Sequence, residues 1–433
     1  MPRLPAALAA AALLAVLIPA GARADWGAGV PLASPGHARE LLALAAADDD
    51  RPAVLLQRHS GHHTTISLRT AQSSGRMGAE MAVAAPAHEV QKAQLFAGAH
   101  GDLVAGWLEQ VDGIDQPVLA SGPRLAGRQV LTAPGPREFA TVVLRANRRG
   151  DAVVVLGRYR LHVGYEVWVA SRPAGGRFGA PQLLVMADAE SAAVAIDEQG
   201  GAAVAWLRNG RAEVAQRPAG ATAFGPAVAA GVRPRADSEL AIATDRGHVL
   251  LGWIAGTHQT QWIQASEQPA AGAPFTPPWT LSDPAMRIPW NSWPAVAIDG
   301  HRSLVTWVQG LRREGIGNEQ AALAVRDGDR PWKAARIAGV PAPGHVVESG
   351  VTAGAPGRPP LLVVMTSRVL RLSGATATVR ADGSLSPLRL PRAAADIGSF
   401  PFIAQGGAHS WMGVRHITGP PGTYPGEPLL LRS

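Results

Sequence analysis

The 433-residue chain contains no cysteine. This absence excludes a disulfide scaffold, a thiol nucleophile and any metal site built on thiolates. Charged residues make up only 17% of the chain and aromatic residues only 5%, whereas hydrophobic residues reach 47%. A chain of this composition can bury a large core, so the sequence does not belong to the disordered class.

Lysine is almost missing, because only Lys92 and Lys333 occur among the 40 basic residues. The net charge of +7 is therefore carried almost entirely by arginine. No long run of like charge is present; Arg312 and Arg313, for example, are followed directly by Glu314. Because nucleic-acid surfaces need clustered positive charge, we expect no nucleic-acid partner.

The N-terminus has the pattern of an export signal. Arg3 precedes an apolar stretch from Ala6 to Ile18, and the small-residue pattern Ala22–Ala24 stands before Asp25. This arrangement predicts a signal peptide at residues 1–24 and one mature domain at residues 25–433. No later segment contains 18 consecutive apolar residues, so we expect no membrane span after leader cleavage. The predicted destination is the periplasm or the extracellular medium.

The mature sequence is repetitive. Ala195–Asp197 leads through a glycine turn to a strand ending at Trp206, and Ala297–Asp299 leads in the same way to Trp307. The position of the tryptophan recurs about every 50 residues. The eight positions in register are Gln57, Trp107, Leu156, Trp206, Trp253, Trp307, Met365 and Trp411. We expect the tryptophans to pack each second strand against the neighbouring repeat.

Each repeat continues in a similar way after the tryptophan. A third strand such as Glu213–Gln216 is followed by a turn, Arg172–Gly176 in one repeat and Arg217–Gly220 in another. A fourth strand then opens with an aromatic residue, as at Phe178 and Phe224. Four short strands in about 50 residues are typical of a β-propeller blade.

The two ends of the mature chain complement each other. Residues 26–32 resemble an isolated fourth strand, whereas the last repeat has a first strand near 400–403, a second through Trp411 and a third at 428–431. The sequence therefore predicts an all-β, closed β-propeller of about eight four-stranded blades, in which the N-terminal strand joins the C-terminal blade and removes a free edge. Seven blades is the alternative count, because residues 369–390 are irregular.

The pattern from Ala195 to Pro226 resembles repeats of secreted bacterial β-propellers that are grouped with sialidase-like or BNR-repeat proteins. The chain lacks the Asp-box motif Ser-x-Asp-x-Gly-x-x-Trp of sialidases. The resemblance implies, for a sialidase-like enzyme, an arginine cluster that holds a substrate carboxylate and a tyrosine nucleophile activated by glutamate. Tyr165 and Glu166 have the right residue types, but neighbours on a strand point to opposite faces.

Ligand-binding residues are expected in the loops that join second to third strands and one blade to the next, because these loops share one face of a propeller. The candidates are Arg158, Arg160, Tyr165, Glu166, Arg235, Trp290, Trp293 and Arg312. Alanine substitution of Arg158, Arg160 or Trp293 is expected to weaken binding and to leave stability intact.

A metal site has one candidate, the cluster of His59, His62 and His63 around Gly61, since imidazoles on a turn can converge on zinc or copper. Asp48–Asp50 could supply oxygen ligands to calcium but lacks the spacing of a calcium loop. No phosphate loop or nucleophile elbow is present, and the sequence requires no cofactor.

These observations favour a secreted, non-enzymatic, monomeric propeller that binds a glycan or a protein through its polar loop face. The alternative is a sialidase-like glycoside hydrolase that uses an arginine cluster and a Tyr/Glu pair on the same face. A third possibility is a structural propeller of an envelope assembly, for which a broad exposed apolar patch would be the sign.

Overall fold

The computed structural model describes most of the mature chain. The described residues are 30–32, 39–46, 51–60, 63–72, 76–84, 90–133, 139–160, 164–187, 192–235, 239–257, 259–283, 286–288, 293–311, 319–333, 335–338, 345–353, 358–368, 371–388, 402–405, 410–416 and 427–432. The predicted signal peptide lies outside them. Within these ranges, no helix is long and apolar enough to cross a membrane.

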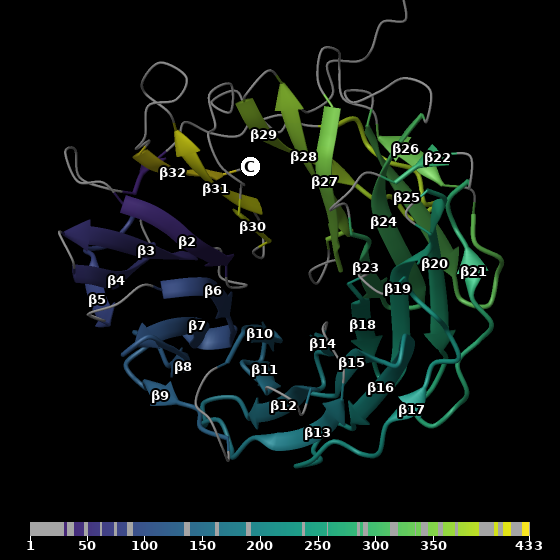
Figure 1. Ribbon diagram of the computed structural model, residues 1–433. Helices are drawn as coiled ribbons and strands as arrows, with labels where there is room; N and C mark the ends of the chain where they lie inside the picture. The colour runs from purple at the N-terminus through teal and green to yellow at the C-terminus, as the bar shows by residue number, and fades with distance from the viewer. Residues whose placement is uncertain are drawn as a thin grey trace, which may run out of the picture.

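Apart from one short 3-10 turn, the elements of the described residues are β-strands, and they form eight antiparallel sheets (Figure 1). The first four sheets in chain order are β2 (Arg39–Ala46), β3 (Pro52–Ser60), β4 (His63–Thr70) and β5 (Met81–Ala84); β6 (Val90–Ala97), β7 (Leu103–Val111), β8 (Ile114–Ser121) and β9 (Gln129–Val130); β10 (Thr141–Ala146), β11 (Ala152–Arg160), β12 (Gly164–Arg172) and β13 (Gln182–Ala187); and β14 (Ala192–Ile196), β15 (Ala202–Arg208), β16 (Arg211–Arg217) and β17 (Val228–Ala229). A short 3-10 turn, η1 (Ala99–Gly101), precedes β7.

The remaining four sheets follow the same plan with variations. They are β18 (Ala241–Asp245), β19 (His248–Gly256), β20 (Gln261–Gln268) and β21 (Trp279–Thr280); β22 (Met286–Arg287), β23 (Ala295–Asp299), β24 (Arg302–Leu311), β25 (Gln320–Asp327) and β26 (Arg336–Ala338); β27 (His345–Thr352), β28 (Leu361–Arg368) and β29 (Arg371–Thr378); and β30 (Phe402–Gln405), β31 (Ser410–His416), β32 (Glu427–Arg432) and β1 (Val30–Pro31). In the sixth sheet, β22 and β23 both pair with β24, so its first strand is split in two.

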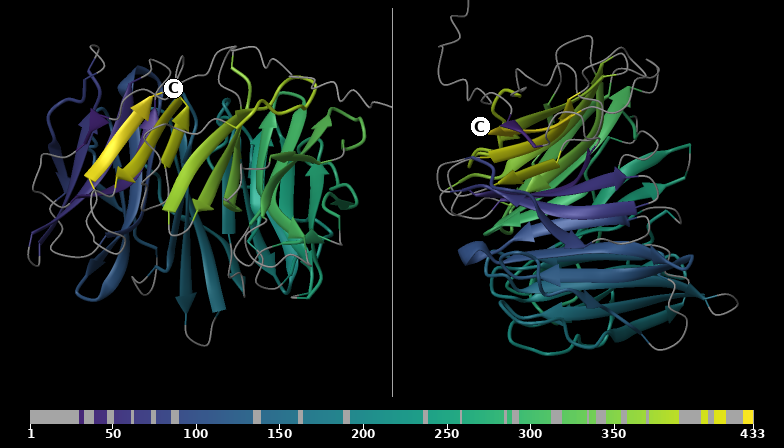
Figure 2. Two further views of the ribbon diagram at one scale, coloured as in Figure 1. Left: turned by 90° about the horizontal axis from the view of Figure 1, so that it is seen from above. Right: turned by 90° about the vertical axis from the view of Figure 1, so that its left-hand side faces the viewer.

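The sheets surround a common centre, and the first strand of each sheet lies nearest to it (Figure 1). These inner strands, β2, β6, β10, β14, β18, β23 and β27, contact one another in succession, and β2 also contacts β30. The two side views in Figure 2 show the strands running through the thickness of this arrangement. The sheets therefore pack face to face around an axis.

The repeated tryptophans form the core, as the sequence predicts. Trp107, Trp206, Trp253 and Trp307 are at most 1% exposed, and each lies on the second strand of its sheet. Each packs with residues of adjacent sheets; Trp206, for instance, belongs to a cluster that joins the third and fourth sheets. Burial of one such side chain stabilises the fold by about 2–3 kcal/mol.

The N-terminal strand pairs with the last strand of the chain. Val30 is opposite Leu430 and Pro31 is opposite Leu429. The sequence predicts an outer strand here, and β1 occupies that outer place beside β32. Leu32, directly after β1, is fully buried with residues of the first sheet. The N-terminal segment therefore contacts both the first and the last sheet.

Hydrogen bonds between neighbouring sheets repeat at the same interval as the sequence. The amide of Asn147 donates to the carbonyl oxygen of Asp197 (2.9 Å), 50 residues later. One carboxylate oxygen of Asp197 in turn accepts from the backbone N–H of Arg246 (2.9 Å), 49 residues further on. The tight turns between first and second strands are thus linked from one sheet to the next.

Candidate functional site

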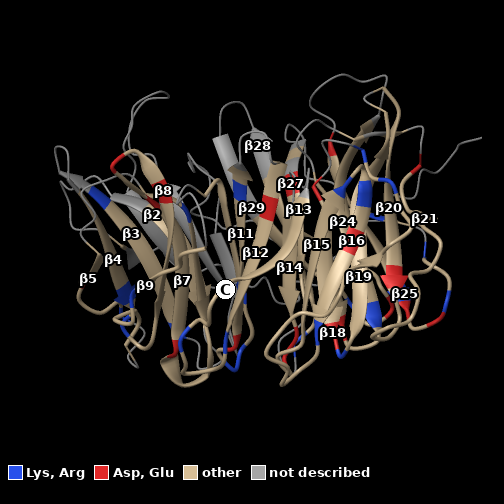
Figure 3. Ribbon diagram, turned by 60° about the horizontal axis from the view of Figure 1, so that its bottom comes forward, with Lys and Arg blue, Asp and Glu red and all other residues tan. Residues whose placement is uncertain are grey.

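The strand order defines two opposite ends of the molecule. The connections between sheets, and those between second and third strands, lie at one end, which we call the loop face. The turns between first and second strands, and between third and fourth strands, lie at the other end, which we call the turn face. Figure 3 shows charged residues mainly at strand ends and in connections, whereas most of the strand length carries other residues.

Arg158 and Glu166, two of the predicted ligand-binding residues, lie in strands β11 and β12 and not in loops. The two residues are directly paired across these strands, and the Arg158 guanidinium forms an ion pair with Glu166. The side chains are 0% and 2% exposed. Glu166 also accepts a hydrogen bond from the indole of Trp168 (2.8 Å). Arg158 further stacks on the rings of Trp168 and Phe139.

This burial corrects one expectation. Alanine at position 158 would leave the carboxylate of Glu166 buried without its cation, so stability would not stay intact. The pair belongs to the packing between the second and third sheets, because Phe139 and Trp168 lie in the cluster that joins them. The sequence placed Arg158 in a loop because a strand ending at Leu156 was expected, whereas β11 continues to Arg160.

Tyr165 and Glu166 have different hydrogen-bond partners. The hydroxyl of Tyr165 lies 3.1 Å from Oγ1 of Thr141 on the inner strand β10, and its ring covers the backbone of Gly157. Burial raises the pKa of the Tyr165 phenol. Glu166 contacts Arg158 and Trp168 instead. The arrangement therefore does not pair this tyrosine with this glutamate for nucleophilic attack.

Arg235 and Trp293 both lie at the loop face but contribute to packing. Arg235 is buried, and its backbone N–H donates to the carbonyl oxygen of Ile254 (3.0 Å). Trp293 packs against the cluster that joins the fifth and sixth sheets. Arg235 contacts the fifth sheet whereas Arg158 lies in the third, so these two arginines belong to separate clusters.

The other predicted residues are described in part or not at all. Arg160 pairs with Gly164 at the end of β11, and its side chain lies outside the described atoms. Trp290, Arg312, His62 and Asp48–Asp50 lie outside the described residues. His59 and His63 are described only in their backbone, as neighbours in the β3–β4 hairpin. In the described ranges, no group of three or more histidine, aspartate or glutamate side chains is placed to hold a metal ion.

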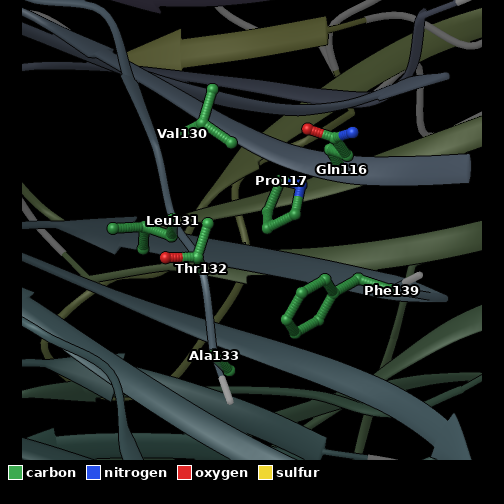
Figure 4. A pocket seen from close by; sticks show the side chains of 7 residues that line it. All are labelled: Gln116, Pro117, Val130, Leu131, Thr132, Ala133 and Phe139. Carbon is green, nitrogen blue, oxygen red and sulfur yellow. The ribbon is translucent and has the colours of Figure 1, made fainter. Parts of the chain in front are cut away.

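A small pocket opens between the second and third sheets (Figure 4). Its lining residues are Gln116, Pro117, Val130, Leu131, Thr132, Ala133 and Phe139. The pocket is mostly apolar and has room for about one water molecule. This size excludes it as a site for a sugar or a peptide side chain.

The axis of the molecule offers a better candidate site, which we call the axial cluster: Lys92 and Glu239 near the loop face, Glu348 further along the axis, and Arg145 towards the turn-face end of β10. Lys92 lies on β6, Arg145 on β10 and Glu348 on β27, and Glu239 directly precedes β18. All four side chains reach solvent, although the surrounding protein partly desolvates Arg145, Glu239 and Glu348. They come from four different inner strands or their entries, so the fold lines one axis with residues that are far apart in the sequence.

A β-bulge positions Lys92. In the pairing of β6 with β7, Gln91 is opposite Leu108 and Gln94 is opposite Gly106, so Lys92 and Ala93 together face one residue, Trp107. Lys92 has a φ of 55°, in the left-handed region that a side chain other than glycine occupies at a cost of about 1–3 kcal/mol. Bulges of this kind redirect a side chain away from the regular alternation of a strand.

The bulge brings two β6 side chains onto the inner edge of β10. The ammonium of Lys92 donates to the carbonyl oxygen of Ala140 (2.7 Å). The amide of Gln94 donates to the carbonyl oxygen of Val142 (2.9 Å), and its oxygen accepts from the backbone N–H of Leu144 (2.9 Å). These bonds satisfy backbone groups that an inner strand would otherwise leave open on its axial side.

Arg145 lies next to this edge. Its Nη1 donates to the carbonyl oxygen of Leu144 (2.8 Å) and lies 3.4 Å from the side-chain oxygen of Gln94. In the part of the chain that the structure describes, no acidic group influences the pKa of Arg145. The surrounding protein lowers the pKa of Arg145 by desolvation. The axial cluster therefore contains a guanidinium whose charge is not neutralised by an acidic neighbour.

The two carboxyl groups of the axial cluster influence each other. Burial raises the pKa of Glu239, and the positive charge of Lys92 partly opposes this shift. Burial also raises the pKa of Glu348, and the negative charge of Glu239 raises it further. Glu348 directly follows a second bulge, between Val346 and Glu348 in the pairing of β27 with β28. Interacting charges from β6, β18 and β27 therefore face the same axis.

Sequence reasoning missed the axial cluster because it searched the loops. The signal was present in the inner strands: the segment 90–97 contains Gln91, Lys92 and Gln94, whereas the equivalent segments 192–196 and 241–245 are rich in alanine. Polar side chains on an inner strand can reach solvent only at the axis. Such an interruption of an otherwise apolar strand is the feature that would have identified the site.

No protein-family model matches the chain, and no curated protein matches it either. Among solved structures, the Dos1 propeller is 10% identical with a TM-score of 0.51, and the match covers 94% of both chains. Oligopeptidase B from Trypanosoma brucei is 12% identical with a TM-score of 0.50 over 89% of this chain, which spans 54% of the length of that enzyme. The polysaccharide lyase Uly1 is 7% identical with a TM-score of 0.48 and is covered over 92% of its length.

At these identities the likeness shows the fold alone. The chain has the all-β fold of a β-propeller, which agrees with the face-to-face packing of its sheets around an axis.

Proposed function

We propose that this chain is an exported, non-enzymatic β-propeller that binds a ligand, a glycan or a protein, at the axial end of its loop face. The mature domain comprises residues 25–433 after removal of the leader at residues 1–24. Its eight sheets are the blades of a closed ring, in which β1 completes the C-terminal blade. The pairing of β1 with β32 supports this closure.

The observation that carries the proposal is the axial cluster. Four exposed ionisable side chains gather at the axis from four inner strands or their entries, and one of them lies on a strained bulge. Strain of this kind persists where the surrounding structure imposes it, and it is concentrated at functional sites. In propellers the axis at the loop face is also a place where all blades can contribute to one ligand.

Several described features favour binding over catalysis. Tyr165 and Glu166 are held by Thr141 and by Arg158 and Trp168, respectively. Glu239 and Glu348 have raised pKa values, but neither lines the small pocket between the second and third sheets. A binding protein needs only complementary charge and shape at this position.

A glycan array with matched lysine variants tests the proposal. Lys92 and Lys333 are the two lysines of the chain; both are exposed, and each donates to one backbone carbonyl, of Ala140 and Asp382 respectively. Lys333 is on the turn face. We expect Lys92→Gln to lose signal on the glycans that the parent binds and Lys333→Gln to retain it.

Retained binding in both variants would contradict an axial site. A parent that binds no glycan on the array would exclude glycans and leave a protein as the ligand. Repeating the array with a chelator tests for a metal separately, since loss of binding would show a dependence on metal, for which His59, His62 and His63 are the candidate ligands.

A further inference from the structure

The axial edge of β10 carries two cations, Lys92 and Arg145. Within the described residues, Arg145 has no acidic partner. Lys92 donates to the carbonyl oxygen of Ala140, and Arg145 donates to that of Leu144. These carbonyls are four residues apart, so at about 3.3 Å per residue the two positive groups contact points about 13 Å apart along the strand. Each cation retains donors that no described protein group accepts: two on the Lys92 ammonium, and Nε and Nη2 on Arg145.

Two carboxyl groups share the axis with this edge: Glu239 lies close enough to Lys92 for the two charges to interact, and Glu348 lies on β27. Within the described residues, no carboxylate acts on Arg145 in this way. The inner strands β14, β18 and β23 are built from alanine, valine and isoleucine, with Thr244 and the terminal residues Asp245 and Asp299 as exceptions. Both aspartates are engaged at the turn face, Asp245 with Arg246 and Asp299 with Arg302. An exposed guanidinium without an acidic neighbour has donors available for an anion that enters from solvent.

From this arrangement we propose that the axial edge of β10 binds an acidic oligosaccharide, one that carries carboxylate or sulfate groups, with Arg145 and Lys92 as the two cations that anchor it. The inference rests on the proposed ligand-binding function and specifies its substrate class. An extended ligand can reach both cations, whereas a small anion can reach only one of them at a time.

An acidic peptide is the competing ligand, and the backbone of β10 argues against it. Peptides commonly bind an open strand edge by pairing with its N–H and C=O groups. On β10 these groups are occupied, because Gln94 bonds both Val142 and Leu144. A ligand at this edge is therefore recognised through side-chain donors, which suit the charged substituents of a sugar chain.

Isothermal titration of the full mature chain with hexagalacturonate tests the inference. We expect binding to the parent and a loss of affinity of about tenfold or more in Arg145→Gln, the size expected for a lost charge-assisted hydrogen bond. Lys92→Gln is expected to weaken binding as well. Arg124→Gln is the matched control, because Arg124 is exposed in the turn after β8, on the turn face, and we expect its affinity to remain that of the parent.

Maltohexaose, hexaglutamate and inorganic sulfate are the comparison probes, and the circular dichroism melting curve of each variant verifies that it is folded. The inference would be overturned if Arg145→Gln bound hexagalacturonate with an affinity within twofold of the parent. It would also be overturned if the parent bound the neutral maltohexaose as tightly as hexagalacturonate. Preferred binding of hexaglutamate would replace the sugar by a peptide. Equal affinity for free sulfate would show a single anion site without an extended ligand.

Failure of this inference can be distinguished from failure of the proposed function. If the parent does not bind hexagalacturonate but binds another glycan in a manner that depends on Lys92, the axial site is supported and the proposed acidic oligosaccharide is wrong. If glycan binding is unaffected by both Lys92→Gln and Arg145→Gln, the axial site itself is wrong.

Discussion

At the scale of single residues, the ion pair of Arg158 and Glu166 separates structural from binding roles most clearly. Both side chains are buried, and the carboxylate is shared between the guanidinium and the indole of Trp168. Such a network specifies how the second and third sheets meet, because each member has its partner only in one arrangement. A residue type that suits ligand binding is thus used here to hold the fold.

We expect Arg158→Leu to lower the free energy of unfolding by about 3–5 kcal/mol, because it leaves the Glu166 carboxylate buried without its cation. The double variant Arg158→Leu/Glu166→Gln removes that charge and keeps an acceptor for Trp168, so it should recover most of the loss. Urea unfolding monitored by tryptophan fluorescence measures both. If the double variant is no more stable than the single one, the buried charge is not the cause.

A second prediction at this scale concerns pH. Burial and the charge of Glu239 raise the pKa of Glu348 above its ordinary value of 4.5 in the folded protein. Ionised Glu348 therefore disfavours the folded state at neutral pH, and this effect disappears as the pH falls towards the value of the unfolded chain, where both states are protonated. Glu348→Gln should raise the melting temperature at about pH 7.5 and leave it unchanged at about pH 3.5.

The matched control for this pH dependence is Asp329→Asn, which removes one negative charge from an exposed position of the turn face. It should shift the melting temperature at neutral pH by less than Glu348→Gln does. An increase of the same size in both variants would show that net charge, and not the environment of Glu348, determines the effect.

At the scale of strands and sheets, the repeat was the part of the fold that the sequence could predict. The predicted third strands at Glu166–Ala170 and Glu213–Gln216 lie within the described strands β12 and β16. The repeated tryptophans and the glycine turns recur with the same period. Period-two alternation and turn chemistry are local properties, so they can be read without knowledge of neighbours. Even the missing tryptophan at Leu156 has a structural explanation, because Trp168 is paired directly opposite it.

The bulges could not be predicted in the same way. The polar residues of β6 mark an unusual inner strand but do not show that a bulge lies at Lys92, and this bulge decides which side chains reach β10. Its position follows from contacts with the next sheet, which are about 50 residues away in the chain. For this reason the loop face was predicted as the general location, whereas the axial cluster was not, and Arg158 was assigned to a loop although it lies inside a strand.

At the scale of the whole molecule, the N-terminal segment connects the first and last sheets. Val30 and Pro31 pair with β32, and the next residue, Leu32, is 0% exposed in a cluster with Leu44, Val54 and Leu56 of the first sheet. The carbonyl oxygen of Leu32 also accepts a hydrogen bond from Arg69 (2.6 Å). Removing the packing of the Leu32 side chain should therefore weaken the connection between the first and last sheets.

We expect Leu32→Ala to lower the free energy of unfolding by about 2–4 kcal/mol through the lost burial and, more specifically, to accelerate hydrogen exchange in β30–β32. The second effect follows because β1 is anchored to the first sheet through Leu32 while its backbone pairs with β32. Leu304→Ala is the control, since Leu304 is equally buried but lies in the sixth sheet. It should destabilise the protein without selectively exposing β30–β32. Unchanged protection of these strands in Leu32→Ala would mean that the C-terminal sheet is held by β2 alone, which also contacts it, and that β1 is not needed to join the two ends.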